Sequence, residues 1–326
     1  MAASAGQDAA VGARRRVAVL IPCFNEEVAV PGVIAAFRAA LPDATVYVYD
    51  NNSTDRTREV AAAAGAVVRT ETLQGKGNVV RRMFADIEAE AYVLVDGDDT
   101  YDAAAAPEMV RLLLADRLDM VTAVRVTEAD AGRAYRPGHR FGNRLLTGMV
   151  RRIFGDRITD MLSGYRVFSR RFVKSFPALA SGFETETEFT VHALELRLPV
   201  GEVRTRYKER PVGSVSKLNT WRDGIRILRT IVLLVQRERP LAFFAGTGAV
   251  LFALSVILAL PLLATYVETG LVPRFPTALL ATGLAILASL STVCGLILDT
   301  VSRGRLETRV LAYLAIPAPS DDADRG

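Results

Sequence analysis

The 326-residue sequence contains few of the residues on which metal centres, disulfide frameworks and thiol chemistry are built. It has two cysteines, two histidines and one tryptophan. Cys23 and Cys294 lie far apart in the chain, so a disulfide framework is not expected, and the soluble part should be cytosolic. His139 and His192 do not have the spacing of metal ligands. The formal net charge of +4 is modest, and we expect no nucleic acid among the partners.

The N-terminus lacks the apolar core of a secretory signal peptide. Residues 1–13 are small and polar, and Arg14, Arg15 and Arg16 lead directly into a strand-like run. We expect a disordered tail over residues 1–14.

Charged residues are absent from two long stretches near the C-terminus. None occurs at 241–267 or at 275–298, and each stretch exceeds the roughly 20 apolar residues that span a bilayer. We predict two transmembrane helices within 240–300, joined as a hairpin by the linker ETGLVPR. A pair of buried core helices is the alternative.

Arginines are distributed unequally around these two stretches. Several precede the first and three follow the second, whereas the linker carries only Arg274. The positive-inside rule then places residues 15–218 and a tail at 301–326 in the cytoplasm, in a multi-pass protein of the cell (inner) membrane. Residues 219–239 interleave arginines with apolar residues. This suits an amphipathic helix on the membrane surface, with an ordinary domain helix as the alternative.

Strand-like and helix-like segments alternate before residue 127. Strands are expected at 17–21, 45–49, 66–70, 91–95 and 119–126, with helices between them, and a helix at 185–197 and an edge strand at 201–210 follow. This alternation predicts an α/β domain over 15–218 with a doubly wound, mainly parallel sheet. In such sheets, ligands bind at the carboxyl ends of the strands.

Four acids follow the expected buried strand at 92–95. Asp96, Asp98, Asp99 and Asp102 occur within seven positions, where like charges repel unless something neutralises them. Mg²⁺ prefers hard oxygen ligands and commonly uses one or two carboxylates together with substrate phosphates. Asp96 and Asp98 are therefore a candidate cation site, although a solvated acidic loop would give the same pattern.

Polar motifs follow three other strands. They are PCFNEE at 22–27, YDNNSTD at 49–55 and QGKGN at 74–78. Asp50 can accept hydrogen bonds from a base, and Lys76 can face a phosphate. Ser53 or Thr54 is expected to cap the helix that follows. Four neighbouring strand ends with polar residues indicate a single binding site.

These motifs, with SGYRVFSRR at 163–171, resemble the family 2 glycosyltransferases of the GT-A fold, and within them the polyprenyl-phosphate (dolichyl-phosphate) sugar synthases. The resemblance covers roughly residues 15–218, and the hairpin that follows is similar to membrane-anchored members. It implies a nucleotide-sugar donor, a polyprenyl phosphate acceptor at the bilayer and Mg²⁺ or Mn²⁺ as cofactor. A homo-oligomer is left open.

The resemblance also implies roles for individual residues. The nucleotide-sugar site would contain Pro22, Asn25, Glu26, Asp50, Lys76, Asp96, Glu186 and Ser216. Asp96 and Asp98 would hold the metal, and Asp98, Arg210 and Lys217 would be catalytic. The acceptor phosphate would lie against Arg125, Arg136, Arg140 and Arg144. Related synthases often have DADLQ where this chain has DGDDT, so Thr100 replaces the glutamine and Asp99 is an alternative ligand.

The expected reaction is inverting transfer of a hexose from a UDP-glucose or GDP-mannose type of donor to undecaprenyl or dolichyl phosphate, for cell-envelope glycans. The alternatives are a non-processive transferase that acts on another lipid and a catalytically dead membrane scaffold with the same fold. A processive polysaccharide synthase is disfavoured because the QxxRW motif and further membrane spans were not found.

Overall fold

The computed structural model describes residues 16–126, 148, 158–179, 184–208, 236 and 239–317. The chain forms two compact units, one of residues 1–220 and 310–326 and the other of residues 221–309.

The first unit contains a seven-stranded sheet with the order β3-β2-β1-β4-β6-β5-β7. The strands are β1 (Val17–Cys23), β2 (Thr45–Asp50), β3 (Val67–Thr70), β4 (Ala91–Leu94), β5 (Met120–Val126), β6 (Arg166–Ser169) and β7 (Val200–Arg206). Strand β6 runs antiparallel to β4 and β5, and all other pairings are parallel. The doubly wound, mainly parallel sheet is confirmed.

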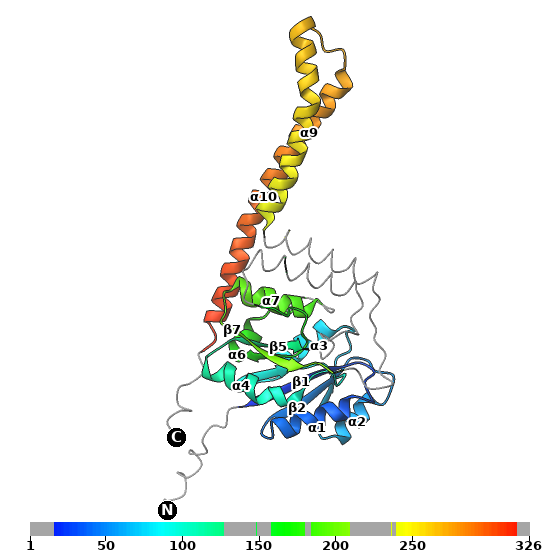
Figure 1. Ribbon diagram of the computed structural model, residues 1–326, viewed down its shortest axis with the longest axis vertical. Coiled ribbons are helices and arrows are strands. Elements are labelled where there is room, and N and C mark those ends of the chain that lie inside the picture. Colours follow the sequence, from blue (N-terminus) through cyan, green and yellow to red (C-terminus); the bar gives the residue numbers. More distant parts are fainter. Residues whose placement is uncertain are drawn as a thin grey trace, which may run out of the picture. The chain divides into compact units, whose positions relative to one another are not determined.

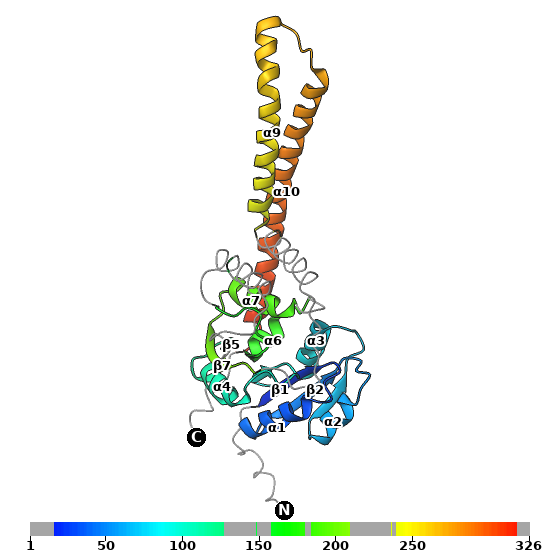
Figure 2. The same ribbon diagram turned by 45° about the vertical axis from the view of Figure 1, so that its right-hand side comes forward.

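Helices cover both faces of this sheet (Figures 1 and 2). They are α1 (Val30–Ala40), α2 (Thr57–Ala63), α3 (Lys76–Asp86), the 3₁₀ turn η1 (Ala103–Ala105), α4 (Ala106–Ala115), α6 (Arg170–Ser175) and α7 (Thr185–Glu195). On one face, Phe37 of α1 and Met109 of α4 pack in an aliphatic core with the strands. On the other, Phe84 of α3, Phe172 of α6 and Phe189 of α7 belong to an aromatic cluster.

Of the two predicted boundaries of α2, its end is confirmed and its start is wrong. Gly65 follows α2 with φ +87°, a left-handed conformation that favours glycine, which confirms the expected end. The expected cap by Ser53 or Thr54 is wrong, because α2 starts at Thr57 and its N-cap is Arg56. The Ser53 hydroxyl instead accepts a hydrogen bond from the Asn25 backbone.

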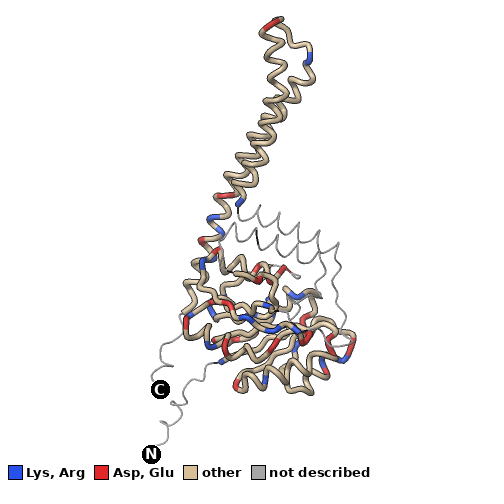
Figure 3. The backbone as a smooth tube through the Cα atoms, in the orientation of Figure 1, with Lys and Arg blue, Asp and Glu red and all other residues tan. Residues whose placement is uncertain are grey.

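The second unit contains α9 (Pro240–Thr269) and most of α10 (Phe275–Leu314). Both helices are long and apolar enough to cross a membrane, and only 6% and 17% of their most apolar windows are buried. Core helices of a soluble domain would be mostly buried, so that alternative is disfavoured. Figure 3 shows few charged residues along the paired helices.

Small residues bring α9 and α10 into close contact. A Cβ atom on Gly248 would lie 2.9 Å from the Ala288 carbonyl oxygen, and the Ser255 hydroxyl donates to the Ala281 carbonyl at 2.7 Å. Packing by small residues and interhelical hydrogen bonds is typical of membrane helix pairs. Helix α10 continues beyond its apolar stretch, so the predicted tail from residue 301 begins within the helix.

Candidate active site

The order in which strands are added to the sheet reverses between β1 and β4. Strand β1 pairs with β2 on one side and with β4 on the other, so the connections after β1 and β4 leave in opposite directions. In open α/β sheets, ligands bind outside the carboxyl ends of the strands at such a switch point. The PCFNEE motif follows β1 there, and the DGDDT motif follows β4.

The loops after β1 and β2 are held together by hydrogen bonds to the Asn25 side chain and main chain. Asn25 has φ 55°, a conformation that asparagine tolerates better than most residues. Its Oδ1 accepts the Thr54 backbone N–H at 2.8 Å, and its own N–H donates to Ser53 Oγ at 2.9 Å. The Glu26 N–H donates to Thr57 Oγ1 at 2.9 Å. Asn25 and Glu26, both predicted site residues, therefore hold the β1 and β2 loops together.

Asp50 is fully buried at the end of β2, next to β1. Its carboxylate accepts the Ser53 N–H at 3.2 Å, and Arg58 Nε lies 3.7 Å away. Pro22 and Cys23 of β1 are paired in register with Tyr49 and Asp50. Asp50 therefore lies beside Cys23, and Pro22 lies beside Tyr49, at the ends of the two neighbouring strands. A shared role of Pro22 and Asp50 in nucleotide binding stays a prediction.

Asn51 joins the β2 and β3 loops, a role that the motif pattern did not reveal. Its side-chain amide donates to the carbonyls of Glu71 and Leu73, both at 2.8 Å, and its Oδ1 accepts the Gly75 N–H at 2.7 Å. Gly75 immediately precedes Lys76, the first residue of α3. Asn51 therefore sets the position at which Lys76 enters the site.

Lys76 is the buried cation of the site. Its Nζ contacts Asp96 Oδ1 at 2.5 Å and also contacts Glu186 Oε1. Burial alone would lower the pKa of Lys76, but the Asp96 and Glu186 carboxylates outweigh it and raise the pKa. The ammonium is therefore charged, and it brings Lys76, Asp96 and Glu186 together from three elements.

The four acids of the DGDDTYD stretch have separate surroundings. Asp98 is buried and its Oδ1 accepts from the Thr100 hydroxyl at 2.6 Å. The Asp99 carboxylate lies beside Gly32 of α1, and Asp102 caps η1 by accepting the Ala104 N–H at 3.0 Å. Of the two carboxylates that contact Lys76, Asp96 is the more exposed, with 31% of its side chain exposed against 7% for Glu186. Separation and local partners make four neighbouring acids tolerable.

A divalent cation fits this site only with help from a substrate. Within the described parts of the chain, no group of three or more His, Cys, Asp or Glu side chains is arranged to hold a metal ion. Asp96 and Asp98 supply two carboxylates, and Mg²⁺ commonly uses one or two carboxylates plus substrate phosphates. The donor set fits an ion that a diphosphate completes.

Arg125 is the described member of the predicted acceptor-phosphate group. Its guanidinium forms a two-pronged ion pair with Asp160, with Nε–Oδ2 and Nη2–Oδ1 distances of 2.7 and 2.8 Å. It also lies over the Tyr207 ring, 5.5 Å from its centroid. Binding of acceptor phosphate by Arg125 stays a prediction. Arg136, Arg140, Arg144, Arg210, Ser216 and Lys217 lie outside the described residues.

Cys23 lies behind the DGD turn and shows no sign of an activated thiol. Burial and the neighbouring carboxylates of Glu26 and Asp50 raise the pKa of its thiol. A Cβ atom on Gly97 would lie 2.7 Å from Cys23 Sγ. The thiol therefore packs against the turn and does not act as a nucleophile.

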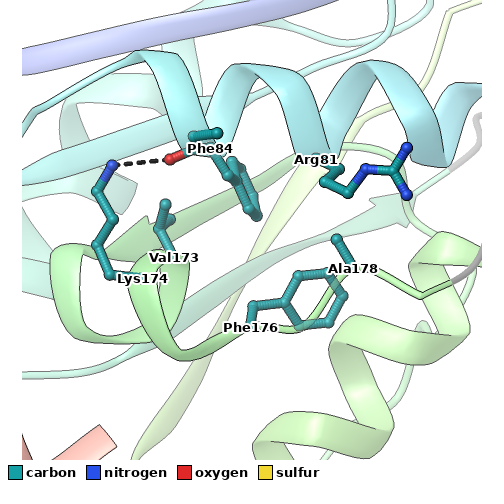
Figure 4. Close-up of a pocket in the computed structure, with 7 residues that line it drawn as sticks. Arg81, Phe84, Val173, Lys174, Phe176 and Ala178 are labelled. Carbon is teal, nitrogen blue, oxygen red and sulfur yellow. Dashed lines mark hydrogen bonds between the residues drawn. The ribbon is translucent and has the colours of Figure 1, made fainter. Parts of the chain in front are cut away.

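A separate hollow of about 250 Å³ lies between α3 and α6. Figure 4 shows Arg81 at one end of it and Lys174 at the other, with the Lys174 ammonium donating to the Phe84 carbonyl at 2.7 Å. Its walls include Phe84 and Phe176, and none of the predicted site residues lines it. It belongs to the aromatic face of the domain.

The sheet and its covering helices have the GT-A fold of glycosyltransferases. Residues 18–176 match the family model described as Glycosyl transferase family 2. The glycosyltransferase AglJ of Haloferax volcanii is 35% identical over 245 residues, 75% of this chain and 80% of AglJ. The chain is therefore an enzyme that belongs to glycosyltransferase family 2.

Two further relatives extend the comparison. The dolichyl-phosphate hexose transferase of Haloferax volcanii is 26% identical over 224 residues, 68% of this chain and 95% of that protein. A crystal structure of glucosyl-3-phosphoglycerate synthase from Mycobacterium tuberculosis, in complex with Mn²⁺ and UDP-glucose, has a TM-score of 0.55. That match is 24% identical and covers 69% of this chain and 79% of the synthase, so it shows the shared fold.

Proposed function

We propose that this enzyme transfers a hexose from a nucleotide diphosphate sugar to polyprenyl phosphate at the inner face of the cell membrane. The single observation that carries the proposal is the combination, in one chain, of a family 2 catalytic fold with the lipid-compatible helix pair α9–α10. A soluble acceptor would need no such pair. The dolichyl-phosphate hexose transferase of Haloferax volcanii supports the same acceptor class.

The donor site is formed by the loops after β1, β2, β3 and β4. Asp50, Asn25 and Pro22 line the nucleoside end, and Asp96, Asp98 and Lys76 lie at the diphosphate end. A divalent cation held by Asp96 and Asp98 would neutralise the diphosphate leaving group. The Mn²⁺ and UDP-glucose complex of a protein with the same fold supports this arrangement.

The segment after β7 starts beside the acid cluster. The Lys208 N–H donates to the Thr100 carbonyl at 2.8 Å, and Tyr207 forms a bridge with Tyr101. Arg210, Ser216 and Lys217 follow in the sequence, outside the described residues. We expect them to cover the donor diphosphate, because their segment begins at this point.

The reaction is a single displacement that inverts the anomeric carbon. A phosphate oxygen of the acceptor attacks that carbon, its bond to the diphosphate oxygen breaks, and the electron pair leaves with the nucleoside diphosphate. The acceptor is anionic at neutral pH, so no general base is needed to deprotonate it. The contact between Glu186 and Lys76 and the packed Cys23 thiol support a mechanism without a protein base or covalent intermediate.

The test is transfer by the detergent-solubilised full chain. UDP- and GDP-hexoses are each incubated with a short polyprenyl phosphate and Mn²⁺, and the lipid products are identified by mass spectrometry. We expect one donor to give a hexosyl phosphopolyprenol. A product formed on diacylglycerol or ceramide but not on polyprenyl phosphate would overturn the acceptor, and failure to consume any nucleotide sugar would favour the scaffold alternative.

The stereochemistry has its own measurement. An α-linked donor should give a β-linked lipid phosphosugar, which the anomeric coupling constants in the NMR spectrum of the product reveal. An α-linked product would contradict a single displacement.

A further inference from the structure

Glu186 lies on a different element from the other acids of the site. It is in the first turn of α7, whereas Asp96 follows β4, and both carboxylates contact the ammonium of Lys76. The Glu186 side chain is 7% exposed and that of Lys76 is 11% exposed. The three groups therefore form a mostly buried chain, acid–ammonium–acid, whose most exposed member is Asp96 with 31% of its side chain exposed.

This geometry is unsuited to a general base. A base must be able to reach the proton that it removes, and the described contacts of Glu186 point inward. Its Oε1 contacts Lys76, and its main-chain carbonyl accepts from the Thr190 hydroxyl at 3.2 Å. Burial lowers the pKa of the Arg166 guanidinium, and the negative charge of Glu186 offsets part of that decrease. The Glu186 carboxylate thus interacts with two cations of the protein itself, Lys76 and Arg166.

The ammonium is divided between two acids, and this division affects Asp96. A cation in contact with a carboxylate competes with a second cation for the same oxygen atoms. Because Glu186 attracts the Lys76 ammonium as well, Asp96 does not have to neutralise it alone. Removal of the Glu186 charge would leave the ammonium to Asp96, at the position where the diphosphate-bound cation must enter.

We propose that Glu186 is a positioning residue that acts through Lys76: it draws the ammonium toward α7 and so keeps Asp96 available to the divalent cation of the donor complex. This inference rests on the donor half of the proposed function and not on the identity of the acceptor. The position of Glu186 in the first turn of α7 also suits a negative charge, because the positive end of the helix dipole lies there.

The test compares Glu186→Gln with Glu188→Gln in the full chain. Glu188 is two residues away on the same helix, and its carboxylate accepts the Leu179 N–H at 2.9 Å. Mn²⁺ binding is measured by the EPR signal of the free ion, in the presence of saturating UDP or GDP, whichever binds the wild-type protein. We expect Glu186→Gln to weaken Mn²⁺ binding by about 10-fold or more, the range typical of groups that orient metal ligands. Glu188→Gln should bind Mn²⁺ like the wild type.

A second variant keeps the outcome clear if Glu186→Gln folds poorly. Lys76→Met/Glu186→Gln removes both charges of the buried contact, so neither is left unpaired. We expect this double variant to regain most of the Mn²⁺ affinity that Glu186→Gln loses, because no ammonium then competes for Asp96. Mn²⁺ affinity that stays as low as in Glu186→Gln would overturn the inference.

Transfer assays separate positioning from base catalysis. With a positioning role, Glu186→Gln raises the Mn²⁺ concentration needed for half-maximal transfer, and saturating Mn²⁺ restores most of the rate. Loss of activity that excess Mn²⁺ cannot restore, with loss of one limb of the pH–rate profile, would identify a base. If the wild-type protein binds Mn²⁺ with neither nucleotide, the donor half of the proposed function falls together with this inference; unchanged binding in Glu186→Gln refutes this inference alone.

Discussion

Asp98 combines burial with a local partner, which makes it a clean position for removing one charge. We expect Asp98→Asn to lower transfer by at least about 100-fold, the effect typical of losing one charge-stabilising group in an active site. The fold should survive, because an asparagine oxygen can still accept from the Thr100 hydroxyl. Initial rates and thermal unfolding of the same preparation measure both effects.

The matched control for this substitution is Asp116→Asn on the exposed end of α4. It makes the same chemical change away from the strand ends of the candidate site, and its rate should equal that of the wild type. Near-wild-type turnover by Asp98→Asn would show that Asp98 is not a ligand of the metal ion.

The Arg125–Asp160 pair makes a pH-dependent contribution to stability. Burial alone would raise the pKa of Asp160, but its hydrogen bonds with Arg125 outweigh burial and hold the pKa below its usual range. A carboxyl group with a lowered pKa in the folded state stabilises above its unfolded pKa of about 3.9, and that stability is lost as the pH falls through the folded value. Asp160→Asn should therefore cost about 3 kcal/mol of unfolding free energy at pH 7, since a mostly buried cation loses its partner.

Chemical denaturation of the solubilised chain, followed by circular dichroism, gives this cost at each pH. The difference between wild type and Asp160→Asn should shrink below about pH 4, because the carboxyl then binds a proton in the unfolded state but, with its lowered pKa, not yet in the folded state. Arg125→Met/Asp160→Asn is the control, because it removes both charges and should cost less than the single substitution. A cost that is the same at pH 3 and pH 7 would show that the charge of Asp160 is not its source.

At the scale of elements, hydrophobic pattern predicted the parallel part of the sheet and missed its antiparallel strand. Strands β1 to β5 have apolar or alternating segments that the sequence shows directly. Strand β6 is only four residues long and begins with Arg166, which is fully buried. Burial of the Arg166 guanidinium is tolerated there because it donates hydrogen bonds to the carbonyls of Ser163 and Met161 at 3.0 and 2.6 Å. Hydrogen bonds that come from tertiary structure leave no periodic signal in the sequence.

The loop before β6 provides a steric test of the position of Asp96. A Cβ atom on Gly164 would lie 2.2 Å from Asp96 Oδ2, closer than any real contact. Gly164→Ala should therefore displace the Asp96 carboxylate and weaken binding of the Mn²⁺–nucleotide complex by roughly 10-fold, as disturbed metal ligands typically do. Calorimetric titration measures the effect.

Gly304→Ala is the control for Gly164→Ala, because nothing lies within 4 Å of the added Cβ atom. It should leave nucleotide binding unchanged. If Gly164→Ala binds the Mn²⁺–nucleotide complex as the wild type does, Asp96 is not held where the structure places it, or it does not take part in binding.

At the scale of the whole molecule, the candidate site comes from residues that are far apart in sequence. The motifs predicted which strand ends would carry polar groups, because parallel strands bring their carboxyl ends to one edge. They did not predict the order of contacts from Asn25 through Asn51 and Lys76 to Glu186. Those contacts depend on side-chain geometry across four loops and α7, which no spacing within one segment encodes.

The end of α10 returns to the catalytic unit. The Tyr313 hydroxyl donates to Asp119 Oδ2 at 2.8 Å, and Arg171 Nε donates to the Ile316 carbonyl at 3.0 Å. Asp119 is buried at the start of β5, and its burial raises the pKa of the carboxyl despite the hydrogen bonds from Ser169 and Tyr313. Residues after the second apolar stretch thus lie against the catalytic unit that precedes the first. This supports a hairpin with both ends on one side of the membrane.

The topology prediction follows from these contacts and from the arginine distribution. In a background with Cys23 and Cys294 replaced by serine, we expect Thr269→Cys to react with an impermeant maleimide added outside intact cells, because it lies at the turn between α9 and α10. Ser302→Cys should react only after the cells are opened, since it follows the second apolar stretch and precedes the segment that contacts Asp119. The pattern of labelling is read by the mass shift of the protein on a gel. Protection of Thr269→Cys in intact cells together with labelling of Ser302→Cys would reverse the orientation, and would place the donor site on the side of the membrane opposite to the cytoplasmic nucleotide sugars on which the proposed function depends.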